Sequence, residues 1–304
     1  MYFYCVNKSI ENAKPFIKWV GGKGQLLSQL GQFLPQNFNK WDEATYVEPF
    51  VGGGAMLFYM LKQFPNIKQA VVNDINAELV TCYLTVKNRC EDLIKSLNSI
   101  EQEYKSLATE NAQKDFYMLM RGKYNNERQF LKEVEITSYF FFLNRTCFNG
   151  LYRVNKKGAF NVPFGRNKNP TICDERTLVA DSEILKNVDI KHGDFTDTFQ
   201  KSAKQTLYYI DPPYRPLNAT SCFNDYAKEA FNDDEQIRLK KFCDMIHKNK
   251  QSFMVSNSDC MINDDPFFDK LYSAYKIERV SASRSINANG AGRGKINEIL
   301  IHNR

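Results

Sequence analysis

Short apolar runs rich in β-branched and aromatic residues alternate along the chain with segments whose apolar residues recur at helical spacing. Strands are expected in ATYVEPF (44–50), QAVVNDI (69–75), VDIKHGDF (188–195), TLYYIDPPY (206–214), QSFMVSNS (251–258), LYSAYKIERV (271–280) and NEILIHN (297–303). Strands that alternate with helices form a largely parallel sheet with helices on both faces. The alternation therefore predicts an α/β fold.

Residues from about 85 to 185 interrupt this alternation. The segment EVEITSYFFFLNR has a helical pattern, and the basic, loop-like segment TCFNGLYRVNKKGAFNVPFGRNKNP follows it. We expect 85–185 to be a second domain, mainly helix and loop, inserted into a domain that consists of 1–84 and 186–304.

The composition is that of an ordinary globular protein, with 43% hydrophobic and 25% charged residues. No apolar stretch approaches the ~20 residues that cross a bilayer, and the N-terminal segment lacks the apolar core of a signal peptide. A cytoplasmic location is therefore expected. The eight cysteines include no C-x-x-C pair, and the three histidines form no H-E-x-x-H motif, so we expect neither a disulfide framework nor a metal site.

The basic residues are unevenly distributed, although the net charge is only +6. Three stretches, 12–41, 136–173 and 281–297, contain several lysines or arginines and no acidic residue. Separate basic stretches in an otherwise balanced chain indicate a polyanionic partner.

A glycine-rich turn follows the first expected strand. Gly52, Gly53 and Gly54 come directly before a helical pattern that begins at Ala55, and Asp74 ends the next strand. Glycines there let a ligand approach the backbone closely, and an acid at the next strand end can bind ribose hydroxyls. The turn lacks the full G-x-G-x-x-G pattern, so S-adenosylmethionine fits better than NAD.

A second glycine-rich segment, KWVGGKGQLL (18–27), does not match the G-x-x-x-x-G-K-[ST] phosphate loop, which excludes an NTPase interpretation. Lys23 could instead hold an anionic group, such as the carboxylate of a methionine, beside Trp19. An ordinary glycine turn before a helix is the alternative.

The run TLYYI ends on Asp211, two prolines and Tyr214. Proline lacks a backbone N–H, and two in succession hold the chain extended just past the sheet, where ligands bind in open α/β folds. The four residues could form a rigid clamp with a carboxylate, a fixed carbonyl and an aromatic ring. They could equally be a strand that ends in a turn.

Taken in order, FIKWVGGKGQLL, VEPFVGGGAMLF, NRTCFNGLYRVNKKGAFNVPFG, HGDF and IDPPY resemble the DNA adenine-N6 methyltransferases of the Dam type (class α, D12) over nearly the whole chain. The resemblance implies a Rossmann-like S-adenosylmethionine-dependent methyltransferase sheet with an inserted DNA-recognition domain, and no metal. The cofactor residues that it implies are Trp19, Lys23, Phe50, Gly52, Gly54, Asp74, Asp194, Phe195 and Asp211. Among them Asp74 would bind the ribose and Asp194 the adenine amino group.

The resemblance also gives the D-P-P-Y segment a role. The Asp211 carboxylate and the Pro212 carbonyl would bind the two N–H groups of a target adenine, so that the nitrogen lone pair points at the sulfonium methyl group for direct in-line transfer. Tyr214 would stack on the base. A base inside a duplex cannot reach such a clamp, so the adenine must be flipped out.

The same resemblance assigns recognition of the DNA sequence to the basic loop. Lys18 and Arg153 would bind guanines, and Leu151 with Pro163 would contact the thymine methyl group. The remaining two positions are Phe148, which would fill the space left by strand distortion, and Asn149, which would contact the opened site. The family usually has tyrosine at position 148, so any hydroxyl contact there is in doubt.

We therefore expect a monomeric, site-specific methyltransferase that modifies adenine N6 in duplex DNA at 5′-GATC-3′. An RNA adenine methyltransferase and a non-catalytic DNA-binding regulator are the alternatives. The sequence leaves open whether the enzyme serves a restriction system, a phage or a host pathway.

Overall fold

The computed structural model describes residues 10–19, 21, 27–201, 205–216, 231–283 and 295–304. The chain divides into two compact units. The first unit comprises Met1–Gly22, Gly52–Gln63 and Asn76–His192, and the second comprises Lys23–Val51, Phe64–Ile75 and Gly193–Arg304. The segment 85–185, expected as an inserted domain, lies entirely within the first unit.

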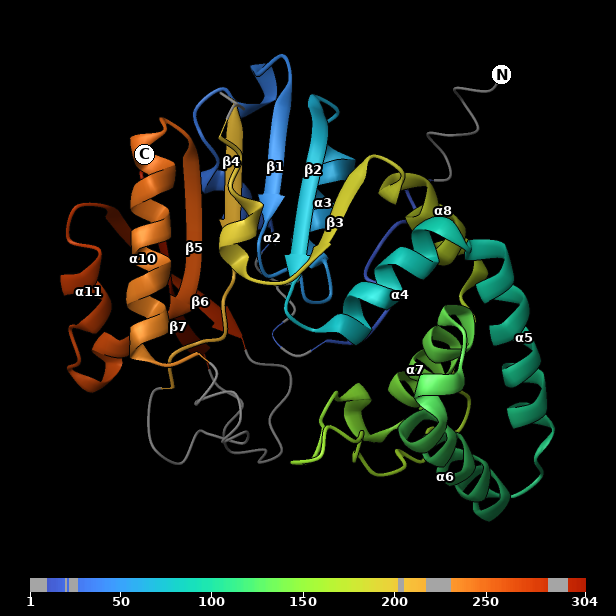
Figure 1. The fold of residues 1–304 in the computed structure, drawn as a ribbon. Helices are drawn as coiled ribbons and strands as arrows, with labels where there is room; N and C mark the ends of the chain where they lie inside the picture. Colours follow the sequence, from blue (N-terminus) through green and yellow to red (C-terminus); the bar gives the residue numbers. More distant parts are fainter. Residues whose placement is uncertain (1–9, 20, 22–26, 202–204, 217–230, 284–294) are drawn as a thin grey trace. The chain divides into compact units, whose positions relative to one another are not determined.

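The described strands form a seven-stranded sheet in the order β3-β2-β1-β4-β5-β7-β6 (Figure 1). Their bounds are β1 Ala44–Glu48, β2 Ile67–Asp74, β3 Val188–His192, β4 Thr206–Ile210, β5 Ser252–Ser258, β6 Lys276–Ser283 and β7 Lys295–His302. Strands β2, β1, β4 and β5 pair in parallel, whereas β7 runs antiparallel to both β5 and β6. The α/β class and the largely parallel pairing are confirmed.

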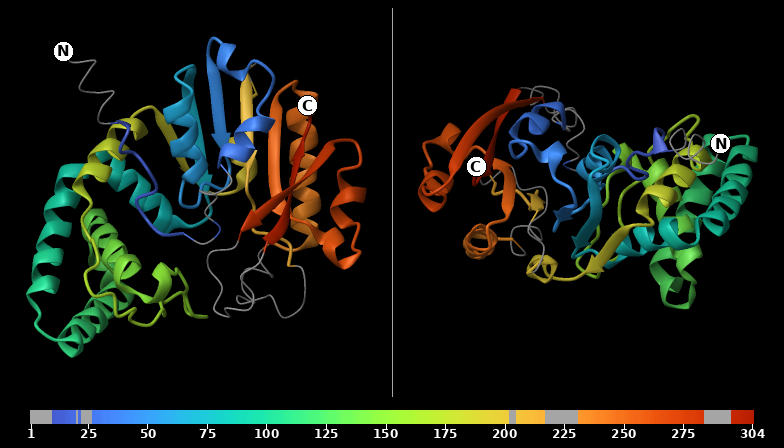
Figure 2. Two further views of the ribbon diagram at one scale, coloured as in Figure 1. Left: turned by 180° about the vertical axis from the view of Figure 1, so that it is seen from behind. Right: turned by 90° about the horizontal axis from the view of Figure 1, so that it is seen from above.

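The core of the second unit lies between the sheet and two helices, α10 (Asp233–Lys248) and α11 (Phe267–Leu271). Alternate strand residues point toward α10, as period-2 alternation requires. The buried side chains that meet there are Val47, Val71, Tyr208, Ile210, Phe253, Val255, Ile299 and Ile301 from the strands and Leu239, Phe242, Cys243 and Ile246 from α10. The two views of Figure 2 show α10 on one face of β4 and β5 and α2 (Leu27–Leu30) with the 3₁₀ turn η1 (Gly31–Phe33) on the other.

The first unit is mainly helical. Its helices are α3 Ala55–Gln63, α4 Ala77–Asn88, α5 Cys90–Ser106, α6 Glu110–Glu127, α7 Glu133–Thr146 and α8 Glu175–Leu185. Helix α7 contacts α4, α5 and α6, and its aromatic residues fill the centre: the Phe142 ring lies 5.4 Å from those of Tyr104 and Phe116. The hydrophobic pattern of EVEITSYFFFLNR thus marks the most buried helix of this unit.

A long irregular segment follows α7 and is attached to α6 by side-chain hydrogen bonds. The Tyr117 hydroxyl donates to the Val162 carbonyl over 2.7 Å. The Asn125 amide donates to the Phe160 carbonyl and accepts from the Phe160 N–H, at 3.0 and 2.8 Å. These bonds fix a loop that has almost no regular secondary structure of its own.

No helix in the part of the chain that the structure describes is both long enough and apolar enough to cross a membrane.

Candidate active site and nucleic-acid interface

The strand register of the second unit brings three predicted site residues to one level. Glu48 of β1 pairs with Val72 of β2, so Phe50 and Asp74 follow at equal distances beyond that pair. Val47 of β1 pairs with Tyr208 of β4, which sets Asp211 level with Phe50. The carboxyl ends of parallel strands share one edge, and in open α/β sheets ligands bind there.

The loops at this edge are joined by the buried side chain of Asn73. Its amide nitrogen donates to the Pro49 carbonyl over 3.1 Å and to the Gly193 carbonyl over 3.0 Å. The backbone carbonyl of Asn73 accepts from the Val51 N–H over 2.9 Å. One asparagine therefore holds the segments that carry Phe50, Asp74 and Asp194. The rings of Phe50 and Phe195 lie 5.3 Å apart in consequence.

Ile75 is an apolar residue with 75% of its surface exposed, directly after Asp74. A large exposed apolar side chain beside a carboxylate suits a ligand that has both hydroxyl groups and a flat apolar part. A nucleoside has this character, so the residues present fit an adenosine-containing cofactor. Sequence analysis selected Asp74 and missed its neighbour.

Asp194 begins the 3₁₀ turn η5 (Phe195–Thr198), where its Oδ1 accepts from the Thr196 N–H over 2.9 Å. The guanidinium of Arg238, on α10, donates to both carboxylate oxygens, at 2.9 and 2.7 Å, and lies 4.1 Å from the centre of the Phe195 ring. The hydrogen bonds from Arg238 hold the pKa of the Asp194 carboxyl well below its usual range. Asp194 is thus a fixed anion, and its Oδ2 can accept a further donor.

The D-P-P-Y segment follows β4 with no regular secondary structure. Pro212 is buried and Asp211 is half-buried, next to the buried strand residues Tyr46 and Tyr209. The Tyr214 hydroxyl donates to Glu298 Oε2 on β7 over 2.8 Å. Burial raises the pKa of Tyr214, so this hydroxyl keeps its proton. The Tyr214 side chain is therefore held at its hydroxyl group by Glu298.

In the first unit the glycine turn packs against two aromatic residues. A Cβ on Gly52 would lie 3.1 Å from the Trp19 ring, and a Cβ on Gly54 would lie 2.4 Å from the Tyr83 hydroxyl oxygen. That hydroxyl donates to the Gly52 carbonyl over 3.1 Å. Both glycines have positive φ, +49° and +74°. Protein side chains therefore approach both glycines closely, while the approach of a ligand to this turn stays a prediction.

Asn144, at the end of α7, joins the segment of Lys18 to the turn η4 (Phe148–Gly150). Its Oδ1 accepts from the Lys18 N–H over 2.9 Å, and its Nδ2 donates to the carbonyls of Lys18 and Gly150, at 2.9 and 3.1 Å. A Cβ on Gly150 would lie 2.3 Å from Lys18 Cδ, so the lysine side chain runs over this turn. The structure therefore brings Lys18 and the turn together.

The loop that carries the exposed residues is fixed by hydrogen bonds of its backbone. The Phe148 N–H donates to the Pro163 carbonyl over 2.9 Å, while the Phe148 ring is 48% exposed. Asn149 is exposed and has a positive φ of 55°. Of the two residues assigned to the thymine methyl group, Leu151 is half-buried and Pro163 is exposed. The backbone of the loop is fixed and these side chains stand at its surface.

Arg153 is exposed and is held by Asn161. Its Nε donates to Asn161 Oδ1 over 2.7 Å and its Nη2 to the Asn161 carbonyl over 3.0 Å. Arg145, which the charge count included among the basic residues of this stretch, instead donates to the Phe16 carbonyl over 2.7 Å. Arg145 therefore has a structural role that its charge does not reveal.

The predicted site residues divide between the two units. The second unit contains Phe50, Asp74, Asp194, Phe195, Asp211, Pro212 and Tyr214, and the first contains Trp19, Gly52, Gly54, Lys18, Phe148, Asn149, Leu151, Arg153 and Pro163. Lys23 lies outside the described residues. Across the described ranges no three His, Cys, Asp or Glu side chains form a group that could hold a metal ion.

Comparison with known proteins identifies the family of the chain. The family model of the D12 class N6 adenine-specific DNA methyltransferases matches residues 19–286. The chain is 47% identical to the type II methyltransferase M.MjaIII of Methanocaldococcus jannaschii over 95% of this chain and 99% of that one. It is 36% identical to the type II methyltransferase M1.LlaDCHI of Lactococcus lactis subsp. cremoris, with 98% of each chain covered. It is 30% identical to a DNA adenine methylase of Vibrio cholerae, with 96% of each chain covered. Matches of this extent show that the chain belongs to the D12 class of N6 adenine-specific DNA methyltransferases.

Proposed function

We propose that this methyltransferase uses S-adenosylmethionine to methylate adenine N6 at 5′-GATC-3′ in duplex DNA, after the adenine has been flipped out of the helix. The observation that carries the proposal is that the D-P-P-Y segment directly follows β4 at the carboxyl edge of the sheet, where the strand register sets Asp211 level with Phe50 and Asp74. The cofactor supplies an electrophilic methyl group on a sulfonium.

The Asp211 carboxylate and the Pro212 carbonyl would accept the two N–H groups of the adenine. The N6 lone pair is delocalised into the ring, and two fixed acceptors favour a pyramidal nitrogen whose lone pair is available. Pro212 is buried, so its carbonyl has a fixed direction before the base arrives. Oriented dipoles of this kind need no reorganisation during the reaction. The Tyr214 ring, attached through its hydroxyl to Glu298, would stack on the base.

Cofactor binding is proposed for residues of each unit. In the second unit, Asp74 would accept from the ribose hydroxyls, and Asp194, fixed by Arg238, would accept from the adenine amino group through Oδ2. Phe50 and Phe195, 5.3 Å apart, would provide an apolar surface. In the first unit, the turn of Gly52 and Gly54 would bring the backbone close to the cofactor beside Trp19, and Lys23 would hold its carboxylate.

Site recognition is proposed for the exposed side chains of the first unit. Arg153 and Lys18 would bind guanines in the major groove, and Leu151 and Pro163 would contact the thymine methyl group. Phe148 and Asn149 would fill and contact the opened site. The structure supports this proposal because Asn144 and Asn161 fix the backbone and the guanidinium that these contacts require.

A transfer assay with labelled S-adenosylmethionine tests the whole proposal. Three substrates are needed: a duplex with one GATC, a duplex with those four bases permuted, and the single strand of the first. We expect label on the GATC adenine of the duplex only. Label on adenine in another context would reject GATC and the roles given to the loop. Equal label on the single strand would reject the requirement for a flipped duplex base.

Replacing Arg153 by alanine should relax specificity at one guanine position. A bidentate guanine contact is worth ~1–3 kcal/mol of discrimination, and Arg153 would make one of them. The measurement is kcat/KM on GATC and on duplexes substituted at each guanine. Lys156→Ala, a change at another exposed basic residue of the same loop, serves as the control and should affect all sequences alike. Uniform weakening by Arg153→Ala would make Arg153 a phosphate contact instead.

A further inference from the structure

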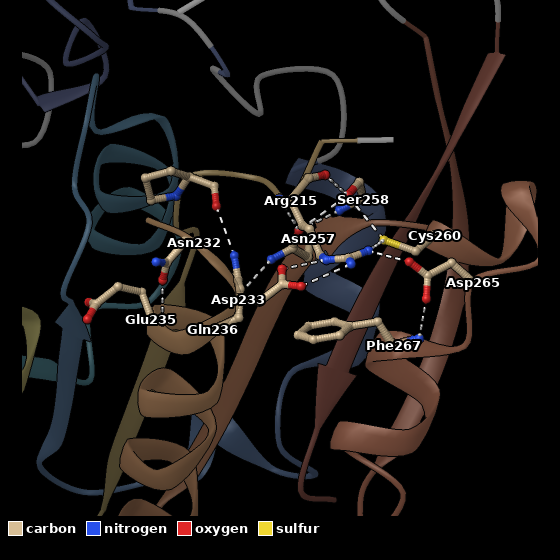
Figure 3. Close-up of polar contacts among 11 residues, drawn as sticks. Arg215, Asn232, Asp233, Glu235, Gln236, Asn257, Ser258, Cys260, Asp265 and Phe267 are labelled. Atoms are coloured by element: carbon tan, nitrogen blue, oxygen red, sulfur yellow. Dashed lines mark hydrogen bonds and ion pairs between the residues drawn. The ribbon is translucent and has the colours of Figure 1, made fainter. Parts of the chain in front are cut away.

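The D-P-P-Y segment can donate few backbone hydrogen bonds. Pro212 and Pro213 have no N–H, and the segment Asp211–Pro216 has no regular secondary structure, so ladder hydrogen bonds cannot fix it. Side chains from other elements bind its backbone instead. The structure shows which ones (Figure 3).

Two buried amide side chains hold the backbone on either side of Tyr214. Gln236 Nε2, on α10, donates to the Pro213 carbonyl over 3.2 Å. Asn257 Oδ1, near the end of β5, accepts from the Arg215 N–H over 3.1 Å. The Pro213 carbonyl and the Arg215 N–H belong to the two peptide groups that flank Tyr214. Fixing both peptide planes fixes the direction in which the Tyr214 side chain leaves the backbone.

The two amides also bind each other. Asn257 Nδ2 donates to Gln236 Oε1 over 3.3 Å, so the contacts form one continuous chain from Pro213 to Arg215. Gln236 is 1% exposed and Asn257 is 0% exposed. Buried amides in a connected network have a defined orientation, because every alternative leaves donors or acceptors unsatisfied. The amide pair is therefore rigid.

Arg215 makes further contacts with β5 and α10 and adds contacts with Asp265 and with Phe267 of α11. Its carbonyl accepts from the Ser258 hydroxyl over 2.6 Å. Its guanidinium binds both oxygens of Asp233, the first residue of α10, at 2.7 and 3.1 Å, and also contacts Asp265. It lies 4.3 Å from the centre of the Phe267 ring. Planar bidentate pairs of this type are geometrically specific.

We propose that Gln236, Asn257 and Arg215 are positioning residues for methyl transfer, which aim the Pro212 carbonyl and the Tyr214 ring through the backbone of Pro213 and Arg215. None of the three is among the residues that the motifs assign to catalysis. The inference rests on the role proposed above for Asp211, Pro212 and Tyr214. A misplacement of about 1 Å in a reacting group can cost a hundredfold in rate.

Gln236→Glu removes the donor to Pro213 with almost no change in shape. We expect kcat at saturating cofactor and DNA to fall about tenfold or more, while KM for both substrates changes less than about threefold. The matched control is Gln251→Glu. Gln251 is equally buried, precedes β5 at its opposite end, and donates through Nε2 to the Gln200 carbonyl over 2.6 Å. Both variants should lose thermal stability, but only Gln236→Glu should lose kcat.

A second pair of variants covers the case in which Gln236→Glu fails to fold. Arg215→Lys keeps the positive charge but loses the planar guanidinium that binds both oxygens of Asp233. Its control is Arg279→Lys, because Arg279 binds Asp259 and both oxygens of Asp269 and not the D-P-P-Y segment. A selective fall in kcat for Arg215→Lys supports the inference. Equal effects on kcat within a pair, or effects on KM alone, overturn it.

The variant Asp211→Ala distinguishes failure of the catalytic assignment from failure of the positioning inference. If it is inactive while Gln236→Glu and Arg215→Lys keep wild-type kcat, the catalytic assignment stands and the positioning inference fails. If Asp211→Ala remains active, the catalytic assignment fails, and the positioning inference fails with it.

Discussion

Replacing Asp211 by alanine is expected to abolish methyl transfer and to leave duplex DNA binding within about twofold of wild type. The carboxylate would contact the N6 amino group as the transition state forms, and losing one such electrostatic contact costs about 10²–10³ in rate. Asp211 is half-buried beside Tyr209, so few phosphate contacts depend on it. Single-turnover transfer and fluorescence anisotropy with a labelled duplex measure the two quantities separately.

Asp211→Asn is the sharper variant, because it keeps the shape and one acceptor oxygen while it removes the charge. We expect it to retain some activity, between those of wild type and Asp211→Ala. Asp264→Asn serves as the control, since Asp264 has a positive φ of 55° that asparagine also tolerates. If Asp211→Ala lost DNA binding and thermal stability along with activity, Asp211 would be a structural residue and its catalytic assignment would be wrong.

Gly54→Ala is expected to reduce the affinity for S-adenosylmethionine by about 100-fold. The new Cβ would lie 2.4 Å from the Tyr83 hydroxyl oxygen, and the φ of +74° costs a non-glycine residue about 1–2 kcal/mol. Tyr83 donates to the Gly52 carbonyl, so its displacement also releases the turn. Isothermal titration with the cofactor gives the dissociation constant.

Gly122→Ala is the matched control in the same unit. Gly122 lies within α6, and a Cβ there would meet nothing within 4 Å. Alanine at that position should raise helix stability by about 1 kcal/mol and leave cofactor affinity unchanged. Wild-type affinity in Gly54→Ala would mean that the turn does not contribute to the cofactor site.

Much of the second unit could be predicted from sequence because its signals are local. Strand segments such as TLYYI are rich in apolar, aromatic and β-branched residues. An acidic residue directly after such a segment marks the edge of the sheet. These signals predict Asp74 and Asp211 at that edge, and the strand register sets the two residues level. Membership of an adenine-specific DNA methyltransferase family also decides against the RNA alternative.

The residues that sequence analysis missed act over long separations. Asn144 binds the backbone of Lys18 across 126 positions, and Arg238 binds Asp194 across 44. Such contacts leave no periodic pattern, because they depend on which elements pack together and not on either segment alone. An amide residue directly after an apolar run, as Asn144 follows FFFL, is a local signal that could have identified such a residue.

The position of β7 has a consequence for how the chain is made. β7 comes after the other six strands in the sequence, yet it pairs with both β5 and β6, and Ile299 and Ile301 belong to the buried core. Until β7 has been synthesised, β5 has an open edge, and open edges of hydrophobic strands can pair with other chains. The described sheet therefore cannot be completed before β7 has been synthesised, and a nascent chain interrupted before Lys295 would lack the partner that protects β5.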